Sequence, residues 1–480
     1  MPTLTIPTSN RPEALQTCLG SFVDRDQQFE RILILDDSGS EKANTANEAA
    51  VGSVQGGRAR SLEHVTRHKK KRLISRLKEI SHGAIPETAI DFALFGDQRL
   101  QTVRGAGCNR NAGLLLCAGD RLVSIDDDAR YGFSQTVQTA GAETKPLLYT
   151  PEPEFRELHV TGAVDSQRRI ENLTEPLNED AASLLLSNLS KQFETAPGRH
   201  GRVRLAMSGI VGNRWYDRPE ALFFNEGPLR EEIYRKRRRY LAARESGLAI
   251  MQAPAATATD ATFFVTCFSA MDAKNILPPF PPAGHADDTL FSLVMKGCYP
   301  NDLIAHLPFV VRHDLGPPRP VRKEHFYRKG VTFNLMTGAL IREASAVPQT
   351  DAADAAMRLI GRRMQRLAEL SHEEWIEQCH DLRMRRIART IEGLERRLER
   401  YNEKPAFWAR DVERHIDFLR TDNIEPSHAV PRELLVDNSE EDATALHRDF
   451  FRSYGELLTV WPEIWQAART LNEDRIEVIH

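Results

Sequence analysis

The stretch Arg31-Ile32-Leu33-Ile34-Leu35-Asp36-Asp37-Ser38-Gly39-Ser40 joins a run of aliphatic residues to two acids and a turn. A continuous aliphatic run without polar alternation is typical of a strand that is buried on both faces. Upstream, Leu4-Thr5-Ile6 predicts another strand, and Pro12 with the polar residues before it predicts a helix start. Strand, helix and strand in this short span form a βαβ unit, so the sequence predicts a parallel sheet.

A second acidic strand end lies farther along, where Leu122-Val123-Ser124-Ile125 runs into Asp126-Asp127-Asp128. Neighbouring carboxylates repel one another and are costly to bury unless a cation neutralises them. Oxygen ligands favour Mg²⁺ or Mn²⁺, and these ions often accompany a phosphorylated substrate. The alternative interpretation of the three acids is a solvated acidic turn without a metal. Because ligands bind beyond the carboxyl ends of parallel strands, we expect these acids to share one crevice with Pro7-Thr8 and Asp36-Asp37.

The composition excludes several classes of protein. The chain has 480 residues, which predicts two or three domains, and a formal net charge of −4, which does not favour a nucleic-acid binder. The 6 cysteines form no C-x-x-C pair, so neither a disulfide framework nor structural zinc is expected. The first residues show no basic region followed by an apolar one, so no signal peptide is expected, and no apolar run approaches membrane-spanning length. We therefore expect a cytoplasmic protein that is not transmembrane.

The periodicity divides the chain into two regions. From about residue 345 onward, apolar residues recur at helical spacing between Arg and Glu, which predicts helices only. Pro462 predicts a break in the last of these helices. We expect an α/β domain over residues 1–344 and a helical accessory domain over residues 345–480, used for oligomerisation or acceptor docking.

Three segments inside the α/β region have their own patterns. Residues 41–100 are expected to form a polar insertion, and its basic stretch His68–Arg72 is interpreted as a solvated helix face rather than a phosphate or acceptor contact. Thr262–Phe268 predicts a strand. Pro278–Pro282 predicts a rigid extended segment that leads to a helix containing Leu290 and Phe291.

Five segments, taken together and in this order, resemble the motifs of family-2-type glycosyltransferases with the GT-A fold. They are Thr5–Pro12, Ile34–Ser40 ("DDGS"), Gly105–Leu114 ("ARNxG"), Ala118–Asp128 (leading into "DXD") and Phe268–Phe291 (containing the "ED" pair). The chain departs from the family pattern at Asn109, where Ala is usual, and at Asp287, where Glu is usual. The resemblance covers about residues 1–315 and implies a GT-A domain with a mixed, mostly parallel sheet.

The resemblance also implies roles for individual residues. Residues expected at the nucleotide-sugar are Pro7, Thr8, Asn10, Arg11, Asp37, Ser38, Arg110, Asn111, Asp126 and Asp127. Asp126, Asp128 and His313 are expected to bind Mn²⁺ or Mg²⁺, and Asp288 or Asp287 to act as the catalytic base. The alternatives are helix capping and packing for Arg110 and Asn111, helix N-terminal stabilisation for the acid pair, and a surface pair of His313 with Asp314.

These roles describe a metal-dependent, inverting glycosyltransferase that moves a sugar from a nucleotide-sugar, with UDP favoured, to an unknown acceptor such as a peptide, protein or glycan. The Q-x-x-R-W segment of processive synthases is missing, so transfer of single sugars is expected. Two alternatives stay open: a catalytically inactive scaffold that binds nucleotide-sugar, and a nucleotidyltransferase. The helical region also makes a homodimer possible.

Overall fold

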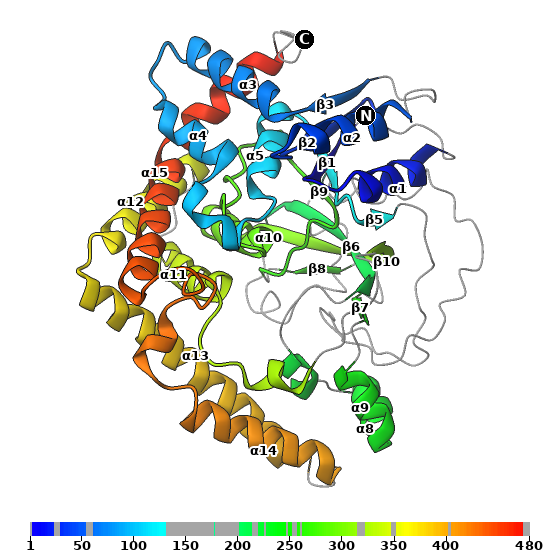
Figure 1. Ribbon diagram of the computed structural model, residues 1–480, viewed down its shortest axis with the longest axis vertical. Coiled ribbons are helices and arrows are strands. Elements are labelled where there is room, and N and C mark those ends of the chain that lie inside the picture. Colours follow the sequence, from blue (N-terminus) through cyan, green and yellow to red (C-terminus); the bar gives the residue numbers. More distant parts are fainter. Residues whose placement is uncertain are drawn as a thin grey trace.

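The computed structural model describes residues 2–23, 29–53, 61–130, 177, 201–213, 219–224, 227–245, 248–251, 257–259, 262–313, 322–346, 352–401 and 405–473. Figure 1 shows a central sheet, helices packed around it, and long C-terminal helices along one side. None of the helices in these segments is long and apolar enough to cross a membrane.

A mixed sheet of ten strands forms the centre of the described structure. In spatial order its main path is β3 (Leu62–Val65), β2 (Arg31–Asp36), β1 (Thr3–Thr8), β4 (Leu122–Ile125), β9 (Phe268–Met271), β6 (Val203–Asn213), β10 (Leu303–His313) and β5 (Ala129–Arg130), with β7 (Leu248–Met251) on β6 and β8 (Thr257–Thr259) on β10. The four strands from β3 to β4 are parallel, β9 is antiparallel to both neighbours, and β6 is parallel to β10.

The strand register brings the candidate residues to one edge of the sheet. Thr8 of β1 is paired with Asp36 of β2, and Thr5 is paired with Ser124 of β4. The amide of Asp37 donates to the carbonyl of Thr8 over 3.0 Å, which extends the pairing by one residue. The acids that follow β2 and β4 therefore lie at the same carboxyl-terminal edge, as the βαβ pattern predicts.

Helices of the N-terminal half pack around this sheet. They are α1 (Pro12–Val23), α2 (Glu41–Gly52), α3 (Arg67–Ile80), α4 (Glu87–Phe95) and α5 (Gly107–Leu116), with a short 3₁₀ helix η1 (Gln98–Val103). Residues 41–100 differ from the expected polar insertion, because they contain β3 and its buried Val65. Leu77 and Ile90 of the helices also lie in the main core. Their few apolar residues fall on one face of each helix, which the average polarity of the stretch conceals.

The C-terminal region is helical, which confirms the predicted class of an α/β sheet followed by helices. Helix α10 (Asp287–Cys298) precedes β10, and the elements described after β10 are η4 (Lys323–Tyr327), α11 (Phe333–Ser345), α12 (Ala353–Ala368), α13 (His372–Arg400), α14 (Ala406–Thr421), η5 (Pro426–Ala429) and α15 (Glu440–Glu473). Helices α12 and α15 lie side by side (Figure 1). A Cβ atom at Gly361 would lie 2.4 Å from the carbonyl oxygen of Gly455, so only glycine permits this close approach.

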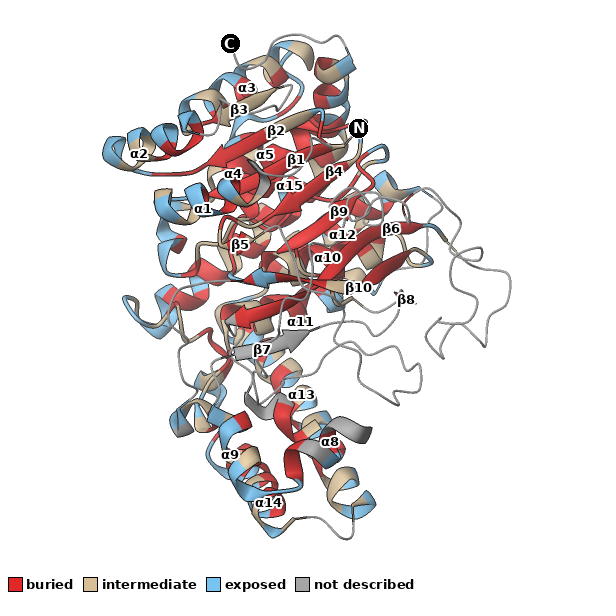
Figure 2. Ribbon diagram, turned by 90° about the vertical axis from the view of Figure 1, so that its right-hand side faces the viewer, coloured by how far each residue is buried: buried red, intermediate tan, exposed pale blue. Residues whose placement is uncertain are grey.

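The C-terminal helices contribute to two different cores. Phe450, Tyr454 and Trp461 of α15 belong to the same core as the sheet, where buried residues concentrate (Figure 2). Trp408 of α14 belongs instead to a second core, with Tyr240 and other residues of η3 (Pro219–Phe224), α8 (Gly227–Tyr234) and α9 (Arg237–Glu245). The division of the chain at residues 344 and 345 stays a prediction.

Two predicted elements differ from the structure. Residues 262–267 form no strand: β9 begins at Phe268, and the segment before it lies against α10, where the hydroxyl of Ser292 donates to the carbonyl of Thr262. Helix α15 continues through Pro462 without the expected break. In the turn before this proline, Arg358 of α12 donates to the carbonyl of Thr459 over 2.6 Å, so a neighbouring helix supplies a donor there.

Candidate functional site

The three consecutive acids after β4 form a tight turn. The amide of Asp126 donates to the carbonyl of Cys267 over 3.1 Å, and the amide of Ala129 donates to the carbonyl of Asp126 over 3.0 Å. We call Asp126, Asp127, Asp128, Asp287 and Asp288 the acid corner, because contacts described below connect the turn to the start of α10.

Residues at the end of β1 and just after it contact two acids of this turn. The Thr8 hydroxyl donates to Asp127 over 2.8 Å, and the half-exposed Arg11 guanidinium contacts Asp127 at 3.2 Å and Asp128 at 2.8 Å. Burial and the neighbouring Asp128 raise the pKa of Asp127 to about 7. Burial also opposes ionisation of Asp128, but His313 and Arg11 outweigh it, so the pKa of Asp128 is lowered.

Arg110 connects the turn after β4 to the helix α10. Its guanidinium donates to Asp126 over 2.7 Å and to Asp287 over 2.5 Å, and its side chain is only 8% exposed. One buried cation thus holds two acids, Asp126 and Asp287, that lie far apart in the sequence. Burial disfavours the charged guanidinium, but Asp287 and Asp126 outweigh this and raise the pKa of Arg110.

Two glycines permit the packing that puts Arg110 in place. A Cβ atom at Gly105 would lie 2.1 Å from the carbonyl oxygen of Gly284, and one at Gly107 would lie 2.0 Å from that of Pro281. Only glycine avoids these clashes. The segment before α10 therefore packs directly on the start of α5, and this contact explains both glycines without a ligand.

Asp288 is the acid of the corner that no described arginine contacts. Its carboxylate accepts from the amide of Thr266 over 3.3 Å and from the amide of Thr289 over 2.6 Å. Burial and the charge of Asp287 raise the pKa of Asp288 to about 7. The residue as a whole is of intermediate exposure, so a ligand can approach it and exchange a proton near neutral pH.

The predicted metal ligands are brought together in part. Nε2 of His313 lies 3.3 Å from Oδ1 of Asp128, and this buried oxygen has no hydrogen-bond partner among the described residues. Asp128 and His313 thus fit two positions of a divalent-ion site, while Asp126 is turned toward Arg110. No group of three or more His, Cys, Asp or Glu side chains suited to a metal is present in the described segments. Asp314 lies outside them.

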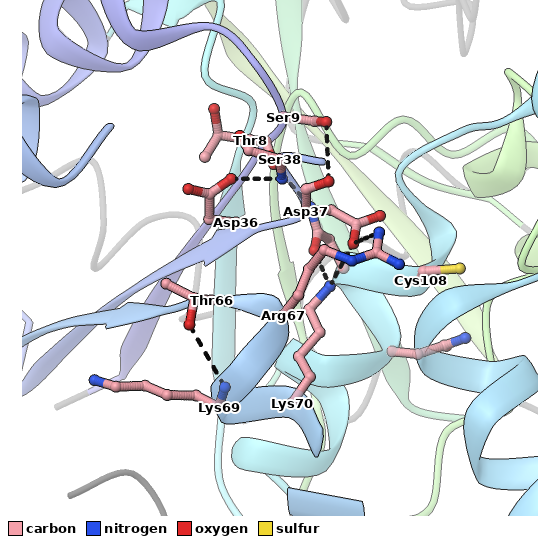
Figure 3. A network of polar contacts seen from close by, with 12 residues as sticks. Thr8, Ser9, Asp36, Asp37, Ser38, Thr66, Arg67, Lys69, Lys70 and Cys108 are labelled. Carbon is pink, nitrogen blue, oxygen red and sulfur yellow. Dashed lines mark hydrogen bonds and ion pairs between the residues drawn. The ribbon is translucent and has the colours of Figure 1, made fainter. Parts of the chain in front are cut away.

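A second polar cluster surrounds Asp37 (Figure 3). Arg67 contacts one carboxylate oxygen of Asp37 at 2.9 Å, Lys70 lies 3.5 Å from the same oxygen, and Arg104 contacts the other oxygen. Lys70 is completely buried and also donates to the side-chain oxygen of Asn109. Burial lowers the pKa of Lys70, and Asp37 opposes this shift. We call Asp37, Arg67, Lys70 and Arg104 the Asp37 corner.

The sequence does not predict these three cations as site residues. The prediction of a solvated helix face for His68–Arg72 is wrong for Lys70, which is the buried member of the cluster. A local signal exists: Arg67 and Lys70 are three residues apart at the start of a helix that directly follows Val65, the last residue of β3. This spacing places both side chains on one face at the ligand-binding edge.

The remaining predicted residues have structural contacts. Pro7 lies inside the pairing of β1 with β2. Asn10 has a positive φ of 56°, and its amide donates to the hydroxyl of the buried Ser38 over 2.8 Å. Asn111 is fully buried; its amide group bonds the backbone of Phe280 on both sides, at 2.7 and 2.9 Å, and donates to the carbonyl of Ala93 in the last turn of α4 over 3.0 Å. Its interpretation as a packing residue accounts for all of these contacts.

Similarity of this chain to known proteins is found among solved structures. No protein-family model and no curated protein matches it. Among solved structures, it is similar to one described as the crystal structure of S. aureus TarS 1-349, at 12% sequence identity and a TM-score of 0.35. The similarity covers 88% of this chain and 91% of that chain. A TM-score this low does not support an argument about function.

Proposed function

We propose that this protein is a metal-dependent, inverting, non-processive glycosyltransferase that takes its sugar from a nucleotide diphosphate sugar, with UDP favoured. The observation that best supports the proposal is the Arg110 bridge between Asp126 and Asp287. It joins the two acidic motifs at one edge of a sheet where ligands commonly bind. The family resemblance of the surrounding motifs supplies the reaction.

In this proposal the end of β1 and the turn after β4 hold the donor. Thr8, Arg11 and Asp127 are connected by hydrogen bonds and would lie beside the diphosphate. Asp128 and His313, with Asp126 as a further ligand, would hold Mn²⁺ or Mg²⁺. When bound, such an ion neutralises the negative charge that develops on the leaving diphosphate.

Asp288 is the proposed catalytic base. Asp287 forms an ion pair with the buried Arg110 at 2.5 Å, so its carboxylate is already engaged by a cation. Asp288 has no such partner among the described residues, and its pKa of about 7 suits proton transfer near neutral pH. It would take the proton from the acceptor as the new glycosidic bond forms and the bond to the diphosphate breaks. Attack opposite the leaving group inverts the anomeric configuration.

A combined binding and hydrolysis experiment tests the proposal. Titration calorimetry with UDP and Mn²⁺ should show binding that depends on the metal, and a panel of UDP-sugars should include one that the protein hydrolyses. Asp128→Asn should weaken Mn²⁺ binding and lower turnover at least about 100-fold, because even the loss of indirect metal contacts costs about 10- to 100-fold. Asp381→Asn, a change at a 58% exposed aspartate on α13, is the matched control.

The outcomes separate the alternative functions. Nucleotide binding without hydrolysis of any sugar donor would favour the inactive scaffold, and release of diphosphate from a nucleoside triphosphate would favour a nucleotidyltransferase. Unchanged turnover in Asp128→Asn would contradict the metal site. The acceptor, proposed as a peptide, protein or glycan, and a homodimer through the helical region need separate tests, the second by light scattering of the full chain.

A further inference from the structure

The Asp37 corner has more positive charge than its own carboxylate neutralises. Arg67, Lys70 and Arg104 all lie around the two oxygens of Asp37. One cation is enough to balance one carboxylate, and like charges brought this close repel each other. The neighbouring Asp36 does not compensate, because its carboxylate is buried and contacts His64, Asn47 and the amide of Ser38.

The two arginines are positioned to contact a ligand. Their side chains are 29% and 28% exposed, in contrast to Lys70 at 0%. Each arginine contacts Asp37 through a single nitrogen, so most of its five N–H donors are not used on that carboxylate. The guanidinium of Arg67 also lies over the ring of Phe95, 5.0 Å from its centre, which restricts its orientation.

The backbone adds to the same field. Arg67 and Lys70 lie in the first turn of α3, a helix of 14 residues whose N-terminal end carries partial positive charge. The Thr66 side chain accepts from the amide of Lys69 and so satisfies one of the terminal donors. Helix end, arginine pair and buried lysine therefore all favour a negatively charged group at this place.

We propose that the Asp37 corner is a binding site for a phosphate-type oxyanion, held by Arg67 and Arg104 above the buried Lys70. Planar guanidinium groups match the oxygen pairs of phosphate and form strong charge-assisted hydrogen bonds. The phosphate belongs either to the nucleotide of the donor or to a separate phosphorylated ligand. In both cases Asp37 acts as the internal counter-charge of the site.

Calorimetry of the full chain with pyrophosphate and EDTA tests this site without the metal. The acid corner repels anions when no divalent ion is present, so binding then reports on the Asp37 corner. Arg67→Gln should weaken pyrophosphate binding by about tenfold or more. Arg76→Gln, the same change on the same helix at an arginine paired with Glu79, is the control and should have no effect.

A second variant should change the affinity for pyrophosphate in the opposite direction. Asp37→Asn removes the counter-charge while keeping the side-chain shape, so pyrophosphate affinity should rise, by about tenfold if one charge contact is released. A loss of affinity in Asp37→Asn, or equal binding by wild type and Arg67→Gln, would overturn the site. These results do not depend on sugar transfer: a protein that binds pyrophosphate as expected but hydrolyses no donor would contradict the proposed function only.

Competition with UDP identifies the source of the phosphate. Pyrophosphate that UDP displaces, with uridine having no effect, assigns the site to the phosphates of the nucleotide. Pyrophosphate that stays bound beside UDP assigns it to a separate ligand. Both results support the site provided that Arg67→Gln reduces the binding, whereas displacement by uridine alone would show that the corner receives a base and would overturn the proposal.

Discussion

The two polar corners at the edge of the sheet carry opposite excess charge. In the acid corner, five carboxylates face Arg11, Arg110 and His313. In the Asp37 corner, a single carboxylate faces three cations. Asp37 follows β2, and the acids 126–128 follow β4, which is separated from β2 only by β1. The acid corner has too few cations for its carboxylates, whereas the Asp37 corner has too few carboxylates for its cations.

This difference assigns a different kind of ligand to each corner. An excess of oxygen ligands suits a divalent cation, and an excess of N–H donors suits an anion. A sugar nucleotide with its metal ion brings both charges, so the two corners complement different parts of one ligand or of two ligands that bind together. A substitution in one corner should therefore leave the properties of the other corner unchanged.

The largest effect is expected from Asp288→Asn. Loss of a general base lowers turnover by about 10²- to 10⁴-fold, while binding of pyrophosphate at the Asp37 corner should stay unchanged. The base acts only when it is deprotonated, and burial and Asp287 raise the pKa of Asp288 to about 7. In the wild type, kcat/KM for donor hydrolysis should therefore rise with pH and level off above about 7. A profile that is flat between pH 5 and 9 would exclude Asp288 as the base.

The next largest effect concerns Arg110. Arg110→Met leaves the buried carboxylate of Asp287 and the partly exposed one of Asp126 without their shared partner, which should lower the free energy of unfolding by about 3–5 kcal/mol. Arg104→Met should cost less, about 1 kcal/mol or below, because Arg67 and Lys70 still face Asp37. Urea unfolding of both variants measures the difference.

A rescue variant checks the cause of the Arg110 effect. Adding Asp126→Asn and Asp287→Asn to Arg110→Met removes the uncompensated charges and should restore part of the stability. Equal destabilisation by Arg104→Met and Arg110→Met would contradict the difference in charge balance between the corners.

The acids at the carboxyl-terminal edge of the sheet can be predicted from the sequence, because each strand before them has a clear local pattern. The aliphatic run before Asp36 and the β-branched run before Asp126 each fix one strand, and the parallel crossover then places both strand ends on the same side. The helices with clear 3/4 spacing, such as α13 and α14, are predicted for the same reason.

The partners of the acids are not predictable in this way. Arg110 contacts an acid 177 positions away in the sequence, and Lys70 contacts Asn109, 39 positions away. Such pairs depend on the packing of α3, α5 and α10, which no local pattern determines. The strand expected at residues 262–268 forms only from Phe268 onward, because the backbone of Thr262 and Thr266 bonds side chains of α10 instead.

The smallest effect concerns how α15 supports the acid corner. The Tyr454 hydroxyl donates to the carbonyl of Pro279 over 2.8 Å, and the Trp461 indole donates to the carbonyl of Leu277 over 2.6 Å. Both carbonyls belong to the extended segment that leads into Asp287 and Asp288. Tyr454→Phe removes one buried donor and should lower the free energy of unfolding by about 1 kcal/mol.

The functional effect of Tyr454→Phe should be confined to the acid corner. Because α15 holds the segment before α10, Tyr454→Phe should lower kcat for donor hydrolysis and leave pyrophosphate affinity in EDTA unchanged. Tyr299→Phe is the matched control for stability, since its hydroxyl donates to the carbonyl of Ile276 from the far end of α10. If Tyr454→Phe weakens pyrophosphate binding as much as it lowers kcat, the helix supports the whole sheet edge and the two corners are not mechanically separate.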